Sequence, residues 1–244
     1  MTFIVSPYRY TSRPADMRAF FELFGLRVSH RQGDFTVLQA AGGRVVIHPL
    51  ATSEVTTDHA TSLVFAVPDV QRSADVLEAS GVSVTWWDES FGRLASMASP
   101  VGSVSFDEEN EDPYGYDETA TARPGRVDIV ATVYAEDLDA MQSHFQHLGF
   151  AAGADSTANW RPLRAVSDSG LIGLLGGQGE LNRLPDGSAA TEIGLEVGEP
   201  LDELAARLVA AGIQVETVQA DGPPHLVVID PDGIPIEVYR ANRF

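Results

Sequence analysis

The sequence predicts an α+β fold in which one small unit occurs four times. In each copy an apolar strand precedes an amphipathic helix, and the helix ends at a glycine followed at once by another strand. The four glycines are Gly25, Gly81, Gly149 and Gly212. A unit repeated in this way determines the architecture of the chain before any catalytic residue is considered.

The strands and helices of each unit follow from their local patterns. The first strands are predicted from apolar runs at residues 3–10, 62–67, 127–134 and 192–197. The helices show the helical period, and the last one places apolar residues at i, i+3, i+4, i+7 and i+10. Its apolar residues are Leu201, Leu204, Ala205, Leu208 and Ala211.

Tight turns after the helices indicate further strands. In the last copy, strands at 213–218, 225–229 and 234–239 are predicted, and the final reversal is Asp230-Pro231-Asp232-Gly233. Pro and Gly in this arrangement suit a tight turn. Each unit is therefore β-α-β-β-β.

The strongest break in composition lies at residues 107–126. This segment is acidic, contains Pro113, Gly115, Pro124 and Gly125, and shows no apolar period. Such a segment is typical of a linker. It separates two predicted domains, residues 1–115 and 125–244, each with two units.

Composition excludes several classes of function. The chain has no cysteine, so disulfides, zinc–thiolate sites and cysteine nucleophiles are ruled out. Its net charge of −19, from 35 acidic and 16 basic side chains, disfavours nucleic-acid binding. No apolar run is long enough to span a membrane. The first residues show no secretory signal, so a cytoplasmic location is expected.

Four β-α-β-β-β units in two pairs, together with the terminal segment DPDGIPIEVY at residues 230–239, resemble the vicinal oxygen chelate superfamily. This superfamily includes glyoxalase I, bleomycin-resistance proteins and extradiol dioxygenases. The resemblance implies two tandem glyoxalase-like domains, each with a cup-shaped sheet. It also implies that metal ligands, typically His and Glu, come from the first and last strands of the units.

The residues at those strand positions depart from the superfamily's pattern. In the N-terminal half the positions are Val5, Thr61 or Ser62, His48 and Phe106, so His48 is the one candidate ligand. In the C-terminal half the candidates are Glu192 and Glu237. A catalytic Fe or Zn site usually has three protein ligands that include imidazole. Two carboxylates alone favour a weakly held hard cation such as Mg²⁺ or Ca²⁺.

Other residues are candidates for binding an organic molecule. Phe106 at a ligand position suggests an apolar, metal-free N-terminal cup, and strand alternation directs either Trp86 or Trp87 into it. In the C-terminal cup, alternation around Ile236 and Val238 turns Glu237 inward. Its expected surroundings are Glu192, His225 and Trp160. Ordinary core packing or exposure to solvent is the alternative for each of these side chains.

These observations support two functional hypotheses. The first is a glyoxalase-like protein, a monomer or homodimer, that binds a small, partly aromatic molecule without the standard catalytic metal. Such a protein would sequester its ligand or carry out metal-independent chemistry. The alternative is a metal-dependent lyase or dioxygenase that uses Glu192 and Glu237. The fold does not choose between them, and the sequence leaves open whether the protein is an enzyme.

Overall fold

The structure is a computed structural model. It describes residues 2–53, 57–89, 92–109, 116–119, 123–154, 156–165, 169–177, 183–219 and 223–241. Residues 110–115 and 120–122 of the predicted linker lie outside these ranges. No helix within the described ranges is long and apolar enough to cross a membrane.

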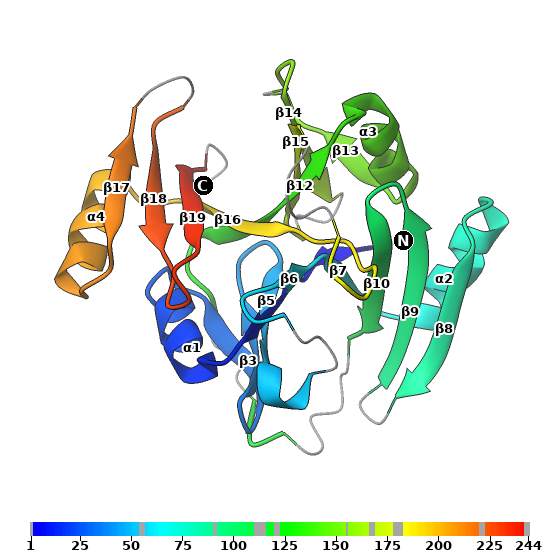
Figure 1. The fold of residues 1–244 in the computed structure, drawn as a ribbon, viewed down its shortest axis with the longest axis horizontal. Coiled ribbons are helices and arrows are strands. Elements are labelled where there is room, and N and C mark those ends of the chain that lie inside the picture. Colours follow the sequence, from blue (N-terminus) through cyan, green and yellow to red (C-terminus); the bar gives the residue numbers. More distant parts are fainter. Residues whose placement is uncertain are drawn as a thin grey trace.

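Four units follow one another along the chain in the predicted order (Figure 1). The first contains β1 (Ile4–Val5), β2 (Tyr8–Thr11), α1 (Pro14–Glu22), β3 (Arg27–Gln32), β4 (Phe35–Gln39) and β5 (Arg44–Pro49). The second contains β6 (Thr61–Ser62), β7 (Val64–Val67), α2 (Val70–Ala79), β8 (Val84–Glu89), β9 (Gly92–Ser99) and β10 (Gly102–Glu108).

The second half repeats this order. The third unit contains β12 (Val127–Ala135), α3 (Leu138–His147), β13 (Phe150–Ala152), β14 (Trp160–Ala165) and β15 (Leu171–Gly176). The fourth contains β16 (Glu192–Val197), α4 (Leu201–Ala210), β17 (Val215–Val218), β18 (His225–Ile229) and β19 (Pro235–Arg240). Two short elements lie outside the repeat, the 3-10 helix η1 (Leu50–Thr52) and the strand β11 (Glu118–Thr119).

The glycines that end the helices adopt the backbone conformation for which glycine is suited. The φ angles of Gly25, Gly81, Gly149 and Gly212 are +93°, +89°, +94° and +82°. Side chains with a Cβ rarely adopt these values, so a glycine here ends the helix and redirects the chain into the next strand. This confirms the repeat predicted from the sequence.

The C-terminal half forms one eight-stranded sheet. Its strand order is β13-β14-β15-β12-β16-β19-β18-β17. The first strands of the two units, β12 and β16, pair antiparallel at the centre, and each is flanked by the last strand of its own unit in parallel. The two units of this half therefore form one sheet, as the predicted fold class requires, and no doubly wound parallel sheet is formed within the described residues.

The N-terminal half has the same strand order, but its centre is divided. Each central first strand is split in two, so β1 pairs with β7 in one sheet while β2 pairs with β6 in another. The break in the first strand falls at Ser6 and Pro7, and proline has no N–H to donate. Two backbone N–H groups beside the divided centre bond instead to carbonyls of the C-terminal half. Val5 N donates to Ser169 O at 2.8 Å, and Leu63 N donates to Ala189 O at 2.8 Å.

An aromatic cluster joins the two halves in one core. Phe3 lies 5.3 Å from Phe65 and 5.9 Å from Phe106 between ring centroids, and Phe65 lies 5.5 Å from Phe150 of β13. All four rings are buried. The third unit therefore packs directly on the first two, and the proposed boundary at residues 115–125 stays a prediction.

A buried ion cluster forms a second link between the halves. Arg9 of β2 contacts Asp230 at 2.5 Å and Asp232 at 3.2 Å, and all three side chains are at most 5% exposed. Asp232 also accepts a hydrogen bond from Thr11 Oγ1 at 2.9 Å. The carboxylate of Asp230 accepts the backbone N–H groups of Asp232 and Ile234. The predicted turn at 230–233 is thus also an anchor for the N-terminal half.

Replacing Arg9 with methionine is expected to destabilise the protein strongly. The substitution leaves Asp230 and Asp232 buried without their cation, and breaking a buried ion pair in this way costs about 3–5 kcal/mol. Urea denaturation followed by circular dichroism measures this loss. The matched control is Arg13→Met, because Arg13 is 53% exposed in its pair with Asp16 and exposed pairs contribute about 1 kcal/mol or less. Equal effects of the two substitutions would contradict this account.

Candidate functional site

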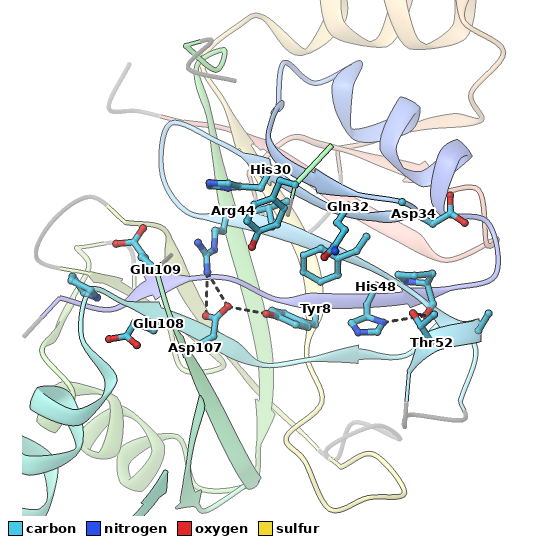
Figure 2. Close-up of a pocket in the computed structure, with 17 residues that line it drawn as sticks. Tyr8, His30, Gln32, Asp34, Arg44, His48, Thr52, Asp107, Glu108 and Glu109 are labelled. Carbon is cyan, nitrogen blue, oxygen red and sulfur yellow. Dashed lines mark hydrogen bonds and ion pairs between the residues drawn. The ribbon is translucent and has the colours of Figure 1, made fainter. Parts of the chain in front are cut away.

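The concave face of the N-terminal half, hereafter the N-terminal cup, contains a cavity of about 650 Å³ (Figure 2). Strands β2, β3, β4, β5 and β10 supply most of its wall, and η1 and the start of the linker close its sides. Its polar and aromatic lining residues are Tyr8, His30, Gln32, Asp34, Phe35, Arg44, His48, Thr52, Asp107, Glu108, Glu109 and Tyr116.

The floor of the cup is an ion pair between two units. Arg44 of β5 donates from Nη2 to both carboxylate oxygens of Asp107 on β10, each at 3.1 Å. Its Nε also donates to Ser6 Oγ at 2.8 Å. Both charged side chains are about nine-tenths buried, at 9% and 12% exposure. The pair is therefore held in place by hydrogen bonds and is electrically neutral as a unit.

Tyr8 completes the floor. Its hydroxyl donates to Asp107 Oδ2 at 2.8 Å. Burial raises the pKa of Tyr8 well above its ordinary value, and the nearby charge of Asp107 adds to the rise. The phenol consequently stays protonated at neutral pH and acts as a hydrogen-bond donor.

His48 presents a hydrogen-bond acceptor to the cavity. Burial lowers the pKa of its half-buried imidazole, so the ring is neutral at pH 7. Its Nδ1 lies 3.1 Å from Pro49 O. A carbonyl can only accept, so Nδ1 carries the proton and Nε2 keeps a lone pair. The rings of Phe35 and Tyr10 lie 5.6 and 5.4 Å away and fix the plane of the imidazole.

A second imidazole lies near the linker. Burial, and then the positive charge of Arg44, lowers the pKa of His30. Its Nδ1 is 3.1 Å from Ser29 Oγ, and its ring centroid is 5.0 Å from that of Tyr116. The cavity therefore has two neutral imidazoles at pH 7, both of them beside aromatic rings.

Three carboxylates complete the lining. Asp34 follows β3, Glu108 ends β10 and Glu109 begins the linker. Within the described part of the chain none of the three forms an ion pair. Figure 2 shows Glu108 and Glu109 beyond Asp107, on the opposite side of the cavity from His48 and Asp34. The site thus has His48 and Asp34 at one end and the carboxylates of Glu108 and Glu109 at the other, and the charge of Glu108 also acts on Arg93.

The structure corrects two predictions about the N-terminal cup. Phe106 is fully buried in the aromatic core, and its neighbour Asp107 faces the cavity instead. A shift of one residue along a strand exchanges its two faces, so the predicted apolar cup has a polar floor. Val5 is likewise buried, and Tyr8 lies on the cavity side of the first strand. His48, by contrast, lines the cavity as its predicted ligand position implies.

The prediction that Trp86 or Trp87 lines this cup is wrong. Both lie on the edge strand β8, are 38% and 39% exposed, and are absent from the cavity wall. Trp86 packs under the guanidinium of Arg93 at 5.4 Å, and Trp87 Nε1 donates to Glu89 at 2.9 Å. Trp86 pairs with Ala95 of β9 and so stays within the sheet, but β8 is its edge strand, and every residue of β8 after Val84 is exposed.

On the C-terminal concave face, two tyrosines hold the predicted carboxylates. Tyr134 donates to Glu192 Oε2 at 2.9 Å, and Tyr239 donates to Glu237 Oε2 at 2.7 Å. The ring of His225 stacks on Tyr239 at 4.7 Å. Burial raises the pKa of Tyr134, and its hydrogen bond to Glu192 and the charges of both glutamates add to the rise, so both carboxylates act on the same phenol.

Strand alternation accounts for these positions. Ile236 and Val238 are buried at 3% and 0% exposure, so Glu237 lies on the opposite face of β19 and is exposed. Glu196, on the same face of β16 as Glu192, bonds to Arg164 at 2.6 Å. That pair is a separate interaction on the same face.

Trp160 fills part of this face. Its indole ring lies over Gly173 of β15 and occupies the space that a side chain there would need. The indole ring of Trp160 therefore covers the sheet surface over β14 and β15, because Gly173 has no side chain and permits this close approach.

The metal that the resemblance implies does not fit these residues. Within the described ranges no group of three or more His, Cys, Asp or Glu side chains is arranged to hold a metal ion. Glu192 and Glu237 have tyrosine partners, and the nearby imidazole of His225 stacks on Tyr239, whereas a catalytic Fe or Zn site has three protein ligands.

The sequence matches no protein-family model and no curated protein. Its structure is similar to that of BphC, a halotolerant catechol dioxygenase, with a TM-score of 0.56, 15% identity, and coverage of 98% of this chain and 86% of that one. It is also similar to homoprotocatechuate 2,3-dioxygenase from Arthrobacter globiformis, with a TM-score of 0.62, 16% identity, and coverage of 99% and 80%. A variant of the B. fuscum homoprotocatechuate 2,3-dioxygenase in complex with HPCA gives a TM-score of 0.63 at 17% identity, with coverage of 99% and 71%.

These matches define the class of fold. The chain has the fold of these catechol and homoprotocatechuate dioxygenases. At this level of identity the likeness concerns the fold alone. The chemistry of the site rests on this chain's own residues.

The imidazoles of His48 and His30 are expected to titrate below pH 6.5, the ordinary value for histidine. Both are held neutral by burial. The unfolded chain thus takes up these protons at a higher pH than the folded chain, and folding stability falls as pH drops below 6.5. NMR titration of the ring protons in the folded and urea-unfolded protein checks both statements. Midpoints at or above 6.5 in the folded state would contradict them.

Proposed function

We propose that the protein binds a small, partly aromatic molecule in the N-terminal cup, without the standard catalytic metal of its fold class. The observation that carries the proposal is the cavity of about 650 Å³ between Tyr8, Phe35, Arg44, His48 and Asp107. Ligand cavities in proteins usually measure about 300–1,000 Å³ and combine apolar walls with a few fixed polar groups.

The lining residues suit such a ligand. Phe35 and the imidazole of His48 are perpendicular to one another, with an interplanar angle of 88°. Offset or edge-to-face packing of a third ring against them adds about 0.5–1.5 kcal/mol beyond burial. The lone pair of His48 Nε2 accepts a hydrogen bond from a phenol or an N–H of the ligand.

Two further facts support an aromatic ligand. The similar structures are enzymes named for catechol and homoprotocatechuate, so this fold class accommodates aromatic molecules of this size. The Arg44–Asp107 pair is already satisfied within the protein, so it forms a rigid polar floor that the ligand need not reorganise. The consequence of binding is sequestration of the ligand or metal-independent chemistry.

A second candidate function concerns the C-terminal face. Glu192 and Glu237 both act electrostatically on Tyr134, so one hard cation between them would relieve their repulsion. A metal-dependent lyase or dioxygenase would need a further ligand that the described residues do not supply. We therefore infer at most a weakly bound divalent metal at this place.

Substitutions in the N-terminal cup are expected to weaken binding. A thermal-shift screen of phenols, catechols and other aromatic compounds identifies a probe. At 100 times its dissociation constant a bound probe stabilises the protein by about 2.7 kcal/mol.

Phe35→Ala and His48→Ala should each weaken the binding of that probe about tenfold, measured by calorimetry, because each removes ring contact or the acceptor. The control Glu237→Gln should leave the affinity unchanged. The opposite pattern would move the site to the C-terminal face.

Metal content separates the two candidate functions. Inductively coupled plasma analysis of the protein, purified without chelator and dialysed, should find less than one Fe, Zn or Mn per chain. Two carboxylates alone hold such ions weakly. One equivalent of metal that is retained through dialysis and lost in Glu237→Gln would contradict the proposal and support the alternative.

A further inference from the structure

The charges that line the N-terminal cup are strongly unequal. Among the described lining residues there are four carboxylates, those of Asp34, Asp107, Glu108 and Glu109, and a single guanidinium, that of Arg44. The two imidazoles, His30 and His48, are held neutral at pH 7 by burial. The described part of the lining therefore carries a net charge of −3 at neutral pH, in a chain whose own charge is −19.

Arg44, the one cation among the described lining residues, already has its hydrogen-bond partners. Arg44 donates to Ser6 and to both oxygens of Asp107. An anionic ligand would have to compete with this buried pair, and separating such a pair costs more than an exposed contact returns. The cup thus offers no free positive group to a carboxylate or phosphate.

The backbone holds two of the remaining carboxylates at one end of the cavity. Glu108 pairs with Val67 in the parallel ladder between β10 and β7, and Glu109 N donates to Val67 O at 2.8 Å. Both residues are half-buried, and Figure 2 shows their side chains on the opposite side of Asp107 from Tyr8 and His48. Partial burial strengthens their attraction for a positive charge relative to open solvent.

We propose that the ligand of this cup is a cationic aromatic compound, a phenol or related ring that carries an ammonium or guanidinium group. This inference rests on the proposed function and adds the ligand's charge to it. The ring lies against Phe35 and His48, its hydroxyl or N–H donates to His48 Nε2, and the cation lies towards Glu108 and Glu109. Each group of the ligand then meets a complementary group of the cup.

A series of three phenols of similar size tests the charge preference. Tyramine is cationic, 4-propylphenol is neutral and 3-(4-hydroxyphenyl)propanoate is anionic. NMR titrations that follow the ring protons of His48 measure the affinity of each at low and at high salt. We expect tyramine to bind about tenfold more tightly than 4-propylphenol at low salt, and the propanoate to bind least. The preference should shrink at high salt, since exposed charges are screened.

Variants test whether the preference for a cationic phenol arises from the carboxylates of the cup. The double substitution Glu108→Gln, Glu109→Gln should bring tyramine to the affinity of 4-propylphenol and leave the neutral probe unchanged. The matched control Glu78→Gln removes an exposed carboxylate on α2, outside the cavity, and should preserve the preference.

The outcomes separate the two proposals. Equal binding of all three phenols to the unmodified protein, sensitive to Phe35→Ala, would overturn the charge preference and leave the aromatic site in place. Tighter binding of the propanoate would also overturn it. Failure of all three to shift the His48 signals at millimolar concentration would count against both proposals.

Discussion

The ion pair between Arg44 and Asp107 connects the two units of the N-terminal half across the floor of the cup. It joins the last strand of one unit to the last strand of the next, and Tyr8 of the first strand bonds to the same carboxylate. Removing either charge would leave the other buried without compensation, which costs about 3–5 kcal/mol. Strands β2, β5 and β10 are thereby fixed relative to one another, and the cavity above them keeps its shape.

The two halves share a topology but differ on their concave faces. In the C-terminal half Trp160 covers Gly173, and tyrosine hydroxyls donate hydrogen bonds to Glu192 and Glu237. In the N-terminal half the corresponding surface is open, and its lining combines two neutral imidazoles, the Arg44–Asp107 pair and the carboxylates of Asp34, Glu108 and Glu109. A duplicated fold has thus acquired two surfaces with different chemistry, because surface chemistry depends on side chains that the topology does not constrain.

Local patterns in the sequence were sufficient for the fold. Helix-ending glycines, apolar periods and turn residues each act within a few residues of chain, and all four units were predicted from them. The face of Glu237 also followed from its neighbours Ile236 and Val238. The residues of the candidate site were harder to predict. A one-residue error in the position of the strand was enough to place Phe106 in the cup instead of Asp107. The Arg44–Asp107 pair joins residues 63 positions apart, and the exposure of Trp86 depends on the place of β8 at the edge of its sheet. Neither is a local property.

The most direct test of the account is a crystal structure of the protein soaked or grown with an aromatic amine such as tyramine. The account predicts density for the ring against Phe35 and His48, with the amine towards Glu108 and Glu109 and the Arg44–Asp107 pair intact. Density for the compound between Glu192 and Glu237, or a metal ion with three protein ligands on that C-terminal face, would contradict it.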